Sequence, residues 1–308
     1  MQTASHQPGQ TLRATVLNGQ LPEAGALTIG LLGRGIGASL SPIMHEREGQ
    51  RVGLDYRYHL IDFDRLGFDD ASLPAVLAEA RELGFVGLNV TYPFKQAVLP
   101  LLDGLAPDAA AIGAVNTIVF GRDRTIGHNT DCWGFAQSFR EGLAGVRLER
   151  VLQLGSGGAG AAVSRALLQE GVRRLDLYDT DPARSHALAD RLHDLFSADV
   201  SVITELPVLT GLTDGIVNTT PVGMAKHPGL PLSPDMIAPR HWIADVVYFP
   251  LETALITHAR SLGCRVLPGG GMAVYQAVRA FELFCGIKPD AQAMTQTFRA
   301  ALADQTRR

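Results

Sequence analysis

The chain contains 308 residues, of which 46% are hydrophobic and 19% are charged, so it can build two hydrophobic cores and is expected to form two domains. The net charge of −4 and the scattered basic residues argue against a phosphate backbone, and hence against nucleic acid, as a partner. The three cysteines show no C-x-x-C spacing, which argues against a disulfide framework and a zinc site, so no metal is expected.

The first 26 residues lack the apolar segment of a signal peptide, and no later stretch approaches the ~20 apolar residues of a membrane span. We therefore expect a cytoplasmic protein without a membrane partner, in which residues 1–26 form a disordered tail. From Leu27 onward, short apolar runs alternate with helix-length amphipathic segments, a pattern typical of parallel α/β units. In the first half a helix is predicted before Gly84, and the predicted strands are Leu27–Leu32, Tyr56–Phe63, Phe85–Thr91 and Ala114–Phe120.

The second half repeats the α/β pattern, and the boundary between the halves is expected inside a helix that begins near Thr130. Helices are predicted near residues 158–170 and 182–195, and two more helical patterns follow the glycine-rich stretch Pro268–Met272. The predicted strands are Val151–Leu154, Leu175–Tyr178, Val200–Ile203, Ile216–Asn218, Trp242–Val247 and Val266–Leu267.

A glycine-rich turn lies between the first of these strands and the helix after it. Gly155, Gly157 and Gly160 have the G-x-G-x-x-G spacing. In dinucleotide-binding folds such glycines permit a tight turn, the approach of the backbone to a pyrophosphate, and the packing of helix on strand. A tight turn without a ligand is the alternative, but the surrounding strands and helix favour a dinucleotide site. Its predicted residues are Gly155, Ser156, Gly157, Gly158, Ala159 and Gly160.

Asp179 directly follows the next predicted strand, roughly 20 residues after the glycine-rich turn, where an acidic residue binds the adenosine ribose hydroxyls. A carboxylate there would repel the 2′-phosphate of NADP. Thr180 stands where a basic residue would favour NADP, and Arg184 is further along the chain. The sequence therefore favours NAD over NADP. Alternatively, Asp179 caps the next helix, although Asp181 is better placed to do so.

Three polar residues of the first half lie where apolar runs give way to loops: Lys95, Asn116 and Asp131. Ligands of open α/β sheets bind beyond the carboxyl ends of strands, so these residues are candidates for the chemistry of hydride transfer from an alcohol. Such a transfer needs a group that takes the hydroxyl proton. The plainer alternatives are a solvated lysine, an aspartate that caps a helix, and a capping role for Ser39 and Ser41.

Eight ordered motifs between about Ile29 and Asp290 resemble the shikimate dehydrogenase family, and within it the NAD-dependent quinate/shikimate dehydrogenases. Together they are far more specific than any one of them. The motifs are SLSPIMHE (Ser39–Glu46), GLNVTYPFK (Gly87–Lys95), GAVNT (Gly113–Thr117), GHNTDCWGF (Gly127–Phe135), GSGGAG (Gly155–Gly160), VNTTPVGM (Val217–Met224), DVVYFPLET (Asp245–Thr253) and GGGMAVYQAVRAFELF (Gly269–Phe284).

The resemblance implies an α/β substrate domain, residues 27–129 plus about 272–308, beside an NAD-binding, doubly wound Rossmann-type domain, residues 130–271. The C-terminal helices would return to the substrate domain, and the active site would lie in the cleft between the domains. A lysine and an aspartate form the family's acid/base pair, which here corresponds to Lys95 and Asp131; which of them takes the proton is left open. The implied substrate-binding residues are Ser39, Ser41, Thr91, Lys95, Asn116, Asp131, Tyr248 and Gln276.

The resemblance also implies NAD as the cofactor, with NADP less favoured. NADP enzymes of the family usually carry Asn-Arg-Thr where this chain has Asp179-Thr180-Asp181. The implied reactions are shikimate to 3-dehydroshikimate and quinate to 3-dehydroquinate, in a monomer or homodimer. An aminoshikimate-preferring or weakly active paralogue, and a non-catalytic dinucleotide-binding regulator, are the alternatives. Further implied cofactor contacts are Thr219, Pro221, Met224, Val246, Gly269 and Met272.

Overall fold

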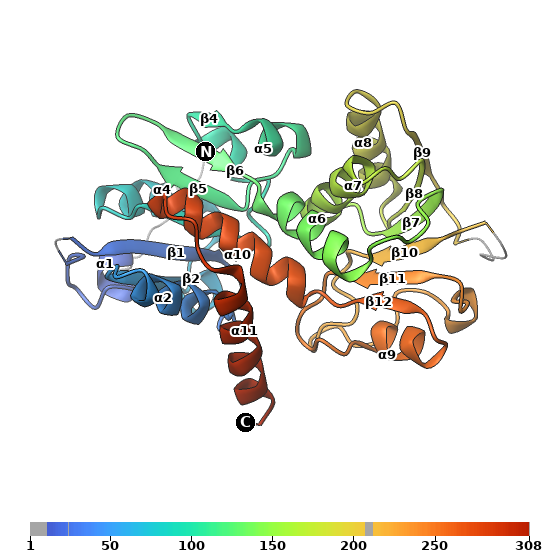
Figure 1. Cartoon of the computed structure of the whole chain (residues 1–308). Helices are drawn as coiled ribbons and strands as arrows, with labels where there is room; N and C mark the ends of the chain where they lie inside the picture. Colours follow the sequence, from blue (N-terminus) through green and yellow to red (C-terminus); the bar gives the residue numbers. More distant parts are fainter. Residues whose placement is uncertain (1–10, 24, 207–211, 308) are drawn as a thin grey trace. The chain divides into compact units, whose positions relative to one another are not determined.

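The structure is a computed structural model that describes residues 11–23, 25–206 and 212–307, and its chain divides into two compact units (Figure 1). Unit 1 comprises Met1–Thr130 and Ala277–Arg308, and unit 2 comprises Asp131–Gln276. The second crossing between the units lies inside helix α10 (Gly270–Cys285), between Gln276 and Ala277, a few residues after the expected position near 272. Helix α10 begins within the glycine-rich stretch Pro268–Met272 and continues past the crossing.

Unit 1 contains a six-stranded sheet in the order β2-β1-β3-β5-β6-β4. β5 runs antiparallel to both β3 and β6, which corrects the expectation of parallel units alone. A short connection at residues 121–124 joins β5 to β6 as a hairpin, and such a connection can only join antiparallel strands. The strands are β1 (Leu27–Gly33), β2 (Tyr56–Asp62), β3 (Gly87–Val90), β4 (Gly104–Leu105), β5 (Thr117–Phe120) and β6 (Thr125–His128).

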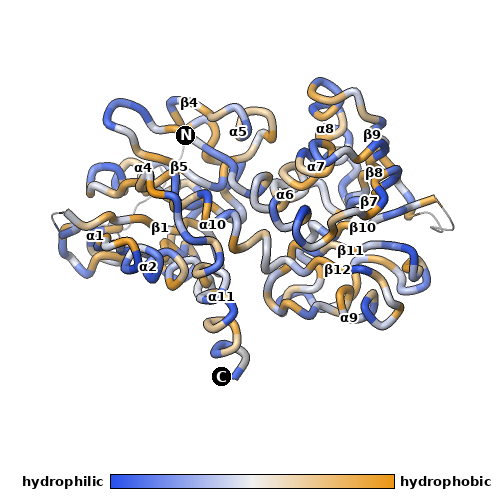
Figure 2. The backbone as a smooth tube through the Cα atoms, in the orientation of Figure 1, coloured by the Kyte–Doolittle hydropathy of each residue, from blue (hydrophilic) through white to orange (hydrophobic). Residues whose placement is uncertain are grey.

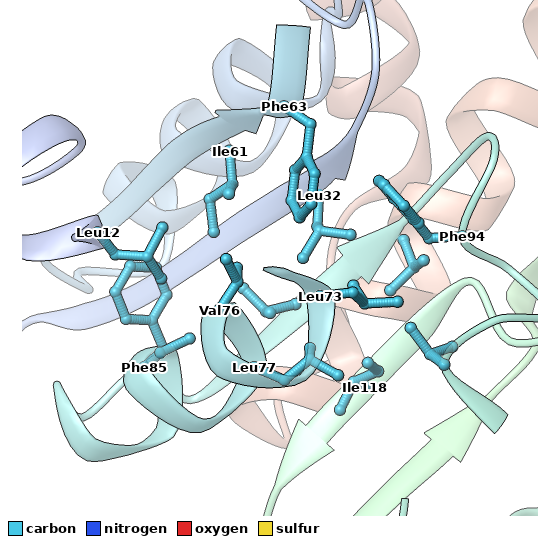
Figure 3. Packing of buried hydrophobic residues seen from close by; sticks show 14 of the residues in the cluster. Leu12, Leu32, Ile61, Phe63, Leu73, Val76, Leu77, Phe85, Phe94 and Ile118 are labelled. Carbon is cyan, nitrogen blue, oxygen red and sulfur yellow. The ribbon is translucent and has the colours of Figure 1, made fainter. Parts of the chain in front are cut away.

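Both faces of this sheet are covered, because successive strand residues point to opposite faces. In β1, Ile29 and Leu31 pack with Phe281 of α10, whereas Leu32 belongs to a second cluster that includes Val76 of α4 (Leu73–Glu82), drawn in Figure 3. The other helices of unit 1 are α1 (Leu12–Thr15), α2 (Ser41–Arg51), α3 (Phe63–Leu66), α5 (Pro107–Ile112) and α11 (Ala291–Thr306), with 3₁₀ turns at Asp70–Ser72 and Leu99–Leu101.

The predicted disordered tail, residues 1–26, is wrong where the structure describes that segment. Leu12 begins α1 and is fully buried in the second cluster (Figure 3). The carboxylate of Glu79, on α4, accepts the N–H groups of Leu12 at 2.8 Å and Arg13 at 3.2 Å. This anchoring depends on a partner far along the chain, which local sequence does not reveal. Residues 1–10 and 24 lie outside the described part of the chain.

Unit 2 contains a six-stranded parallel sheet in the order β12-β11-β10-β7-β8-β9, which is the doubly wound, Rossmann-type order. The predicted α/β class and the Rossmann-type domain are therefore confirmed. All six predicted strands are present, each displaced by no more than a residue or two at its ends. The strands are β7 (Arg150–Leu154), β8 (Arg174–Tyr178), β9 (Asp199–Val202), β10 (Gly215–Asn218), β11 (Trp242–Asp245) and β12 (Arg265–Leu267).

The sheet of unit 2 also has helices on both faces. Leu152 and Leu154 of β7 pack with Leu255 of α9 (Ala254–Ser261), whereas Gln153, between them, bonds to Ser164 of α7 (Gly158–Gln169). Hydrophobic and hydrophilic residues alternate along the helices, as Figure 2 shows. The remaining helices are α6 (Thr130–Gly142) and α8 (Pro182–His193), with a 3₁₀ turn at Pro234–Met236. Within the described residues, no helix has the length and apolar character needed to cross a membrane.

Candidate functional site

The substrate-side residues of unit 1 lie at one edge of its sheet. Ser39 and Ser41 follow β1, and Thr91 and Lys95 follow β3, which is parallel to β1. The antiparallel β5 begins at this same edge, so Asn116, which directly precedes it, lies there too. The N–H of Val90, the last residue of β3, donates to the Asn116 carbonyl at 2.7 Å. Asn116 therefore directly precedes a strand. The predicted strand Ala114–Phe120 would have placed it inside one.

A buried carboxylate shapes the loop between β1 and α2. Asp62, the last residue of β2, is 3% exposed, and its carboxylate accepts the N–H groups of Gly35 and Ile36 at 3.0 Å each. The loop then delivers Ser39 and Ser41 at the start of α2, where the N–H of Ser41 donates to Ser39 Oγ at 3.3 Å. The N-cap position is occupied by Leu40, so Ser41 does not cap the helix as the alternative reading supposed.

The turn after β3 is anchored by an aromatic side chain. Phe94 is 1% exposed and packs on Phe63, with ring centroids 4.6 Å apart. Lys95, the next residue, is half-buried, and its carbonyl accepts the N–H of Val115 at 2.8 Å. Lys95 lies in a turn and not in a helix, so it does not belong to a first helical turn. Tyr92, two residues before Phe94, is 76% exposed and does not pack in the core.

Asn116 holds the start of α6 by two side-chain bonds. Its Oδ1 accepts the Thr130 N–H at 2.8 Å, and its Nδ2 donates to Thr130 Oγ1 at 2.9 Å. Asp131 is the next residue, lies in the first turn of α6 and is 5% exposed. Because α6 begins at Thr130, Asp131 is not its N-cap, although a carboxylate in the first turn suits the helix dipole. The pairing of Asp131 with Lys95, which belongs to the other unit, stays a prediction.

The glycine-rich turn of unit 2 has the geometry that a pyrophosphate requires. Gly155 has a φ of +95°, which favours glycine, and a Cβ on Gly160 would collide with the carbonyl of Gly155. A Cβ on Gly157 would meet nothing within 4 Å, so a ligand can approach the backbone there. Helix α7 begins at Gly158, and among the described residues no side chain caps it. Its first N–H groups can therefore bind phosphate oxygens.

Asp179 connects the end of β8 to this turn. Its Oδ2 accepts the Ser156 N–H at 2.7 Å, and its Oδ1 accepts the Asp181 N–H at 2.9 Å. Asp181 caps α8 by accepting the Ala183 N–H at 3.1 Å, so the expectation that Asp181 is the capping residue is confirmed. Arg184 is exposed and contacts Asp181, with 3.3 Å between Nε and Oδ2.

A residue that sequence reasoning missed organises the loops after β10 and β11. Asp245 is 2% exposed and ends β11; its Oδ1 accepts from Asn218 Nδ2 at 2.9 Å and from the Val247 N–H at 3.0 Å. Its Oδ2 accepts the Thr253 hydroxyl at 2.8 Å. Burial raises the pKa of Asp245 to about 6, although these hydrogen bonds oppose the shift. The available signal was its place as the first residue of the motif DVVYFPLET, directly after the apolar residues Trp242–Ala244.

The remaining predicted cofactor contacts, and the predicted substrate contacts Tyr248 and Gln276, lie in unit 2. They occupy the loops after β10 and β11 and the region around the start of α10. Thr219 Oγ1 donates to the Gly155 carbonyl at 2.8 Å, at the point where the strand order reverses. A Cβ on Gly269 would lie 2.5 Å from the carbonyl of Val246, so these segments touch closely. Met224 and Tyr248 are 41% and 37% exposed. Pro221 precedes Met224 in the turn after β10, and Met272 and Gln276 lie on α10.

Comparison with known proteins places this chain among enzymes of one kind. A family model for the shikimate dehydrogenase substrate binding domain matches residues 31–118, and one for the shikimate 5′-dehydrogenase C-terminal domain matches residues 269–297. The chain is 54% identical to a shikimate dehydrogenase (NADP(+)) of Streptomyces avermitilis, over 86% of this chain and 92% of that protein. It is 46% identical to a quinate/shikimate dehydrogenase (NAD(+)) of Corynebacterium efficiens, over 89% and 98%.

A solved structure extends the similarity to the fold. Quinate dehydrogenase from Corynebacterium glutamicum in complex with NAD is 43% identical and has a TM-score of 0.81. The match covers 89% of this chain and 99% of that one, so it includes both units.

Proposed function

The chain belongs to the shikimate dehydrogenase family, and we propose that it is an NAD-dependent enzyme that interconverts shikimate and 3-dehydroshikimate and also quinate and 3-dehydroquinate. At the level of class, it is a shikimate/quinate dehydrogenase that uses a nicotinamide dinucleotide. The choice of NAD over NADP, the second substrate and the roles of individual residues belong to the proposal, because the relatives named above differ in cofactor and substrate.

The observation that carries the choice of NAD is the position of Asp179. Its carboxylate stands at the end of β8, next to the glycine-rich turn, and is held by two backbone N–H groups. A fixed carboxylate suits the two hydroxyls of an adenosine ribose and repels a 2′-phosphate. Arg184, the nearest candidate for a phosphate contact, already faces Asp181.

In the proposed reaction the substrate loses two hydrogens, one as a hydride and one as a proton, to two different acceptors. The hydride leaves the carbon that bears the reacting hydroxyl and passes to NAD⁺, while the hydroxyl proton passes to the pair formed by Lys95 and Asp131. Ser39 and Ser41 would bind the carboxylate of the substrate, since hydroxyl groups at the start of α2 can donate to it. Thr91, Asn116, Tyr248 and Gln276 would contact the substrate hydroxyls and ring.

The test is the rate of NADH formation, followed by absorbance, with shikimate or quinate as substrate and NAD or NADP as cofactor. We expect turnover of both substrates with NAD and a lower kcat/KM with NADP. A higher kcat/KM with NADP would refute the cofactor assignment, and turnover of shikimate alone would refute the quinate assignment. A protein that binds NAD but oxidises neither substrate would instead be the non-catalytic regulator.

Lys95→Ala tests the acid/base assignment in the same assay. We expect kcat to fall by ~10²–10⁴, as for loss of a general acid or base, while the dissociation constant of NAD changes little, since the glycine-rich turn belongs to unit 2. Lys288→Ala removes an exposed lysine of the same unit and is the matched control. Normal turnover in Lys95→Ala would exclude Lys95 from the chemical step.

A further inference from the structure

A chain of buried polar side chains lies behind Asn116 in unit 1. Tyr58 on β2, Asn89 on β3 and Thr117 on β5 are 5%, 5% and 0% exposed, and Asn116 itself is 3% exposed. The sheet brings them together, because Asn89 and Thr117 are directly paired in the antiparallel ladder of β3 and β5. This series of hydrogen-bonded side chains joins strand β2, at one end of the sheet order, to the first residue of α6.

The hydrogen-bond partners fix the direction of every side chain in this series. The Tyr58 hydroxyl donates to Asn89 Oδ1 at 2.8 Å, so the Asn89 amide turns its Nδ2 toward Thr117 Oγ1, at 2.9 Å. The Thr117 hydroxyl therefore uses a lone pair for Asn89, and its single hydrogen is donated to Asn116 Oδ1 at 3.0 Å. If the Asn89 amide were reversed, its Oδ1 would face Thr117 Oγ1 and take the single hydroxyl hydrogen of Thr117, so Asn116 Oδ1 would lose this donor.

The Thr130 N–H selects one of the two amide orientations of Asn116, and the Thr117 hydroxyl supports the same orientation. A backbone N–H can only donate, so the atom that faces the Thr130 N–H must be the carbonyl oxygen Oδ1, and Nδ2 must lie on the other side. One of the two Nδ2 hydrogens is directed at Thr130 Oγ1. Among the residues that the structure describes, the second hydrogen has no acceptor, so it is left for a ligand at the edge of the sheet where the substrate-side residues gather.

We propose that Tyr58 and Thr117 are positioning residues of the enzyme: Thr117 donates directly to the Asn116 amide, and Tyr58 acts on it through Asn89 and Thr117. Together they hold this amide so that it donates to a substrate hydroxyl and secures the start of α6. This inference rests on the proposed substrate contact of Asn116. Neither residue needs to touch the substrate: the Tyr58 hydroxyl acts through two intervening side chains. Since Asp131 directly follows Thr130, the same series sets where the first turn of α6, with that carboxylate, begins.

The sheet supplies a matched control in a second buried tyrosine. Tyr56 lies on the same strand and is 4% exposed, close to the 5% of Tyr58, but its hydroxyl bonds to His45 Nδ1 at 3.0 Å. Tyr56→Phe and Tyr58→Phe therefore remove the same atom from the same strand with similar burial. Only Tyr58→Phe leaves the Asn89 carbonyl without its donor, so loss of stability alone would affect both variants alike.

The kinetic test compares these two variants, together with Thr117→Val and Thr117→Ser. We expect Tyr58→Phe and Thr117→Val to lower kcat/KM for shikimate by about 10-fold, mainly through KM, as for the loss of one buried hydrogen bond. The KM for NAD should stay the same. Tyr56→Phe should remain within about twofold of wild type, and Thr117→Ser, which keeps the hydroxyl, should recover most of the loss.

A second measurement reports on Asn116 without catalysis. The chain has five asparagines, so selective ¹⁵N-asparagine labelling gives five side-chain amide groups, which Asn→Asp variants can assign. The Asn116 amide signals should shift in Tyr58→Phe and Thr117→Val and stay in place in Tyr56→Phe. Unmoved Asn116 signals, or equal kinetic losses in the two tyrosine variants, would overturn the proposal. If the wild type oxidises no substrate, the proposed function fails, and the signals still decide the inference.

Discussion

Asp179 is both a structural and a recognition residue, and a test of cofactor choice must separate the two. Asp179→Ala would leave the N–H groups of both Ser156 and Asp181 without an acceptor. Asp179→Asn is the better variant, because it removes the charge and keeps one of the two acceptor oxygens. We expect the ratio of kcat/KM for NAD to that for NADP to fall about 10-fold or more, because repulsion of the 2′-phosphate disappears.

Asp190→Asn makes the same change of charge at an exposed position of α8 and serves as its control. The NAD to NADP ratio of this control should match that of the wild type. Equal ratios in all three proteins would mean that the Asp179 carboxylate does not contribute to the choice of cofactor.

Asp245 makes the stability of unit 2 depend on pH. Burial raises its pKa from 3.8 to about 6, so the folded protein retains a proton that the unfolded chain has lost between these values. The stabilisation is complete below pH 4 and is lost as the pH rises through 6. Relative to Asp245→Asn, the wild type should lose roughly 3 kcal/mol of unfolding free energy across this window.

Urea unfolding followed by tryptophan fluorescence measures this effect, because both tryptophans, Trp133 and Trp242, belong to unit 2. The difference in unfolding free energy between the wild type and Asp245→Asn should change between pH 4 and 6 and remain constant above. A difference that is independent of pH would show that Asp245 has an ordinary pKa in the folded protein.

At the residue scale, the sequence motifs predicted which side chains belong to the site. The hydrogen-bond partners of those side chains follow only from the fold. Asp181 as a helix cap follows from its neighbours in the chain, and the prediction is confirmed. Asp245 bonds to Asn218 on β10, and Thr117 bonds to Asn89 on β3, so the partners that define their roles are distant in the chain. The substrate and cofactor roles predicted from the motifs await the experiments above.

Among the elements, α6 and α10 pack so closely within unit 2 that glycine is needed at their contact. A Cβ on Gly134 would lie 2.7 Å from the backbone nitrogen of Gln276, and backbone cannot move aside cheaply. Gly134→Ala should therefore destabilise unit 2 by about 1–3 kcal/mol, the usual cost of overpacking. It should also raise the KM for shikimate if Gln276 contacts the substrate as proposed.

Gly157→Ala is the control for stability, since its Cβ would meet nothing within 4 Å. Its unfolding midpoint, measured by tryptophan fluorescence without cofactor, should remain close to that of the wild type. If Gly134→Ala unfolds at the same urea concentration as Gly157→Ala, the two helices have room to separate and the contact is not tight.

How well each element could be predicted from sequence depends on how regular its surroundings are. The strands of unit 2 are parallel and covered on both faces, so each appears as a short run rich in apolar residues. In unit 1, β4 has two residues, and β6, with the sequence TIGH, has a single large apolar residue, so neither gives a recognisable pattern. The direction of β5 depends on its pairing with β3, which the residues of β5 do not specify.

On the scale of the whole molecule, the two units have separate cores, and the N-terminal segment belongs to only one of them. Leu12→Ala should lower the stability of unit 1 by ~2–5 kcal/mol, because it removes a fully buried side chain from its core. Amide hydrogen exchange should accelerate in β1, β2 and β3 more than in β7 and β8.

The comparison is Leu21→Ala, which truncates a leucine of the same segment that is 61% exposed. This variant should leave amide hydrogen exchange unchanged. Equal protection of β1 in Leu12→Ala and Leu21→Ala would show that α1 contributes nothing to the core of unit 1.

The passage of α10 from one unit to the other has a consequence for the order in which the protein can be made. Unit 2 is one continuous stretch of chain, whereas unit 1 is completed only by residues 277–308. Until a ribosome has released Phe281 and Phe284, the side chains of Ile29, Leu31 and Tyr56 lack the partners that cover them. The segment synthesised first therefore finishes folding last, and an exposed sheet face must remain soluble while the second unit is translated.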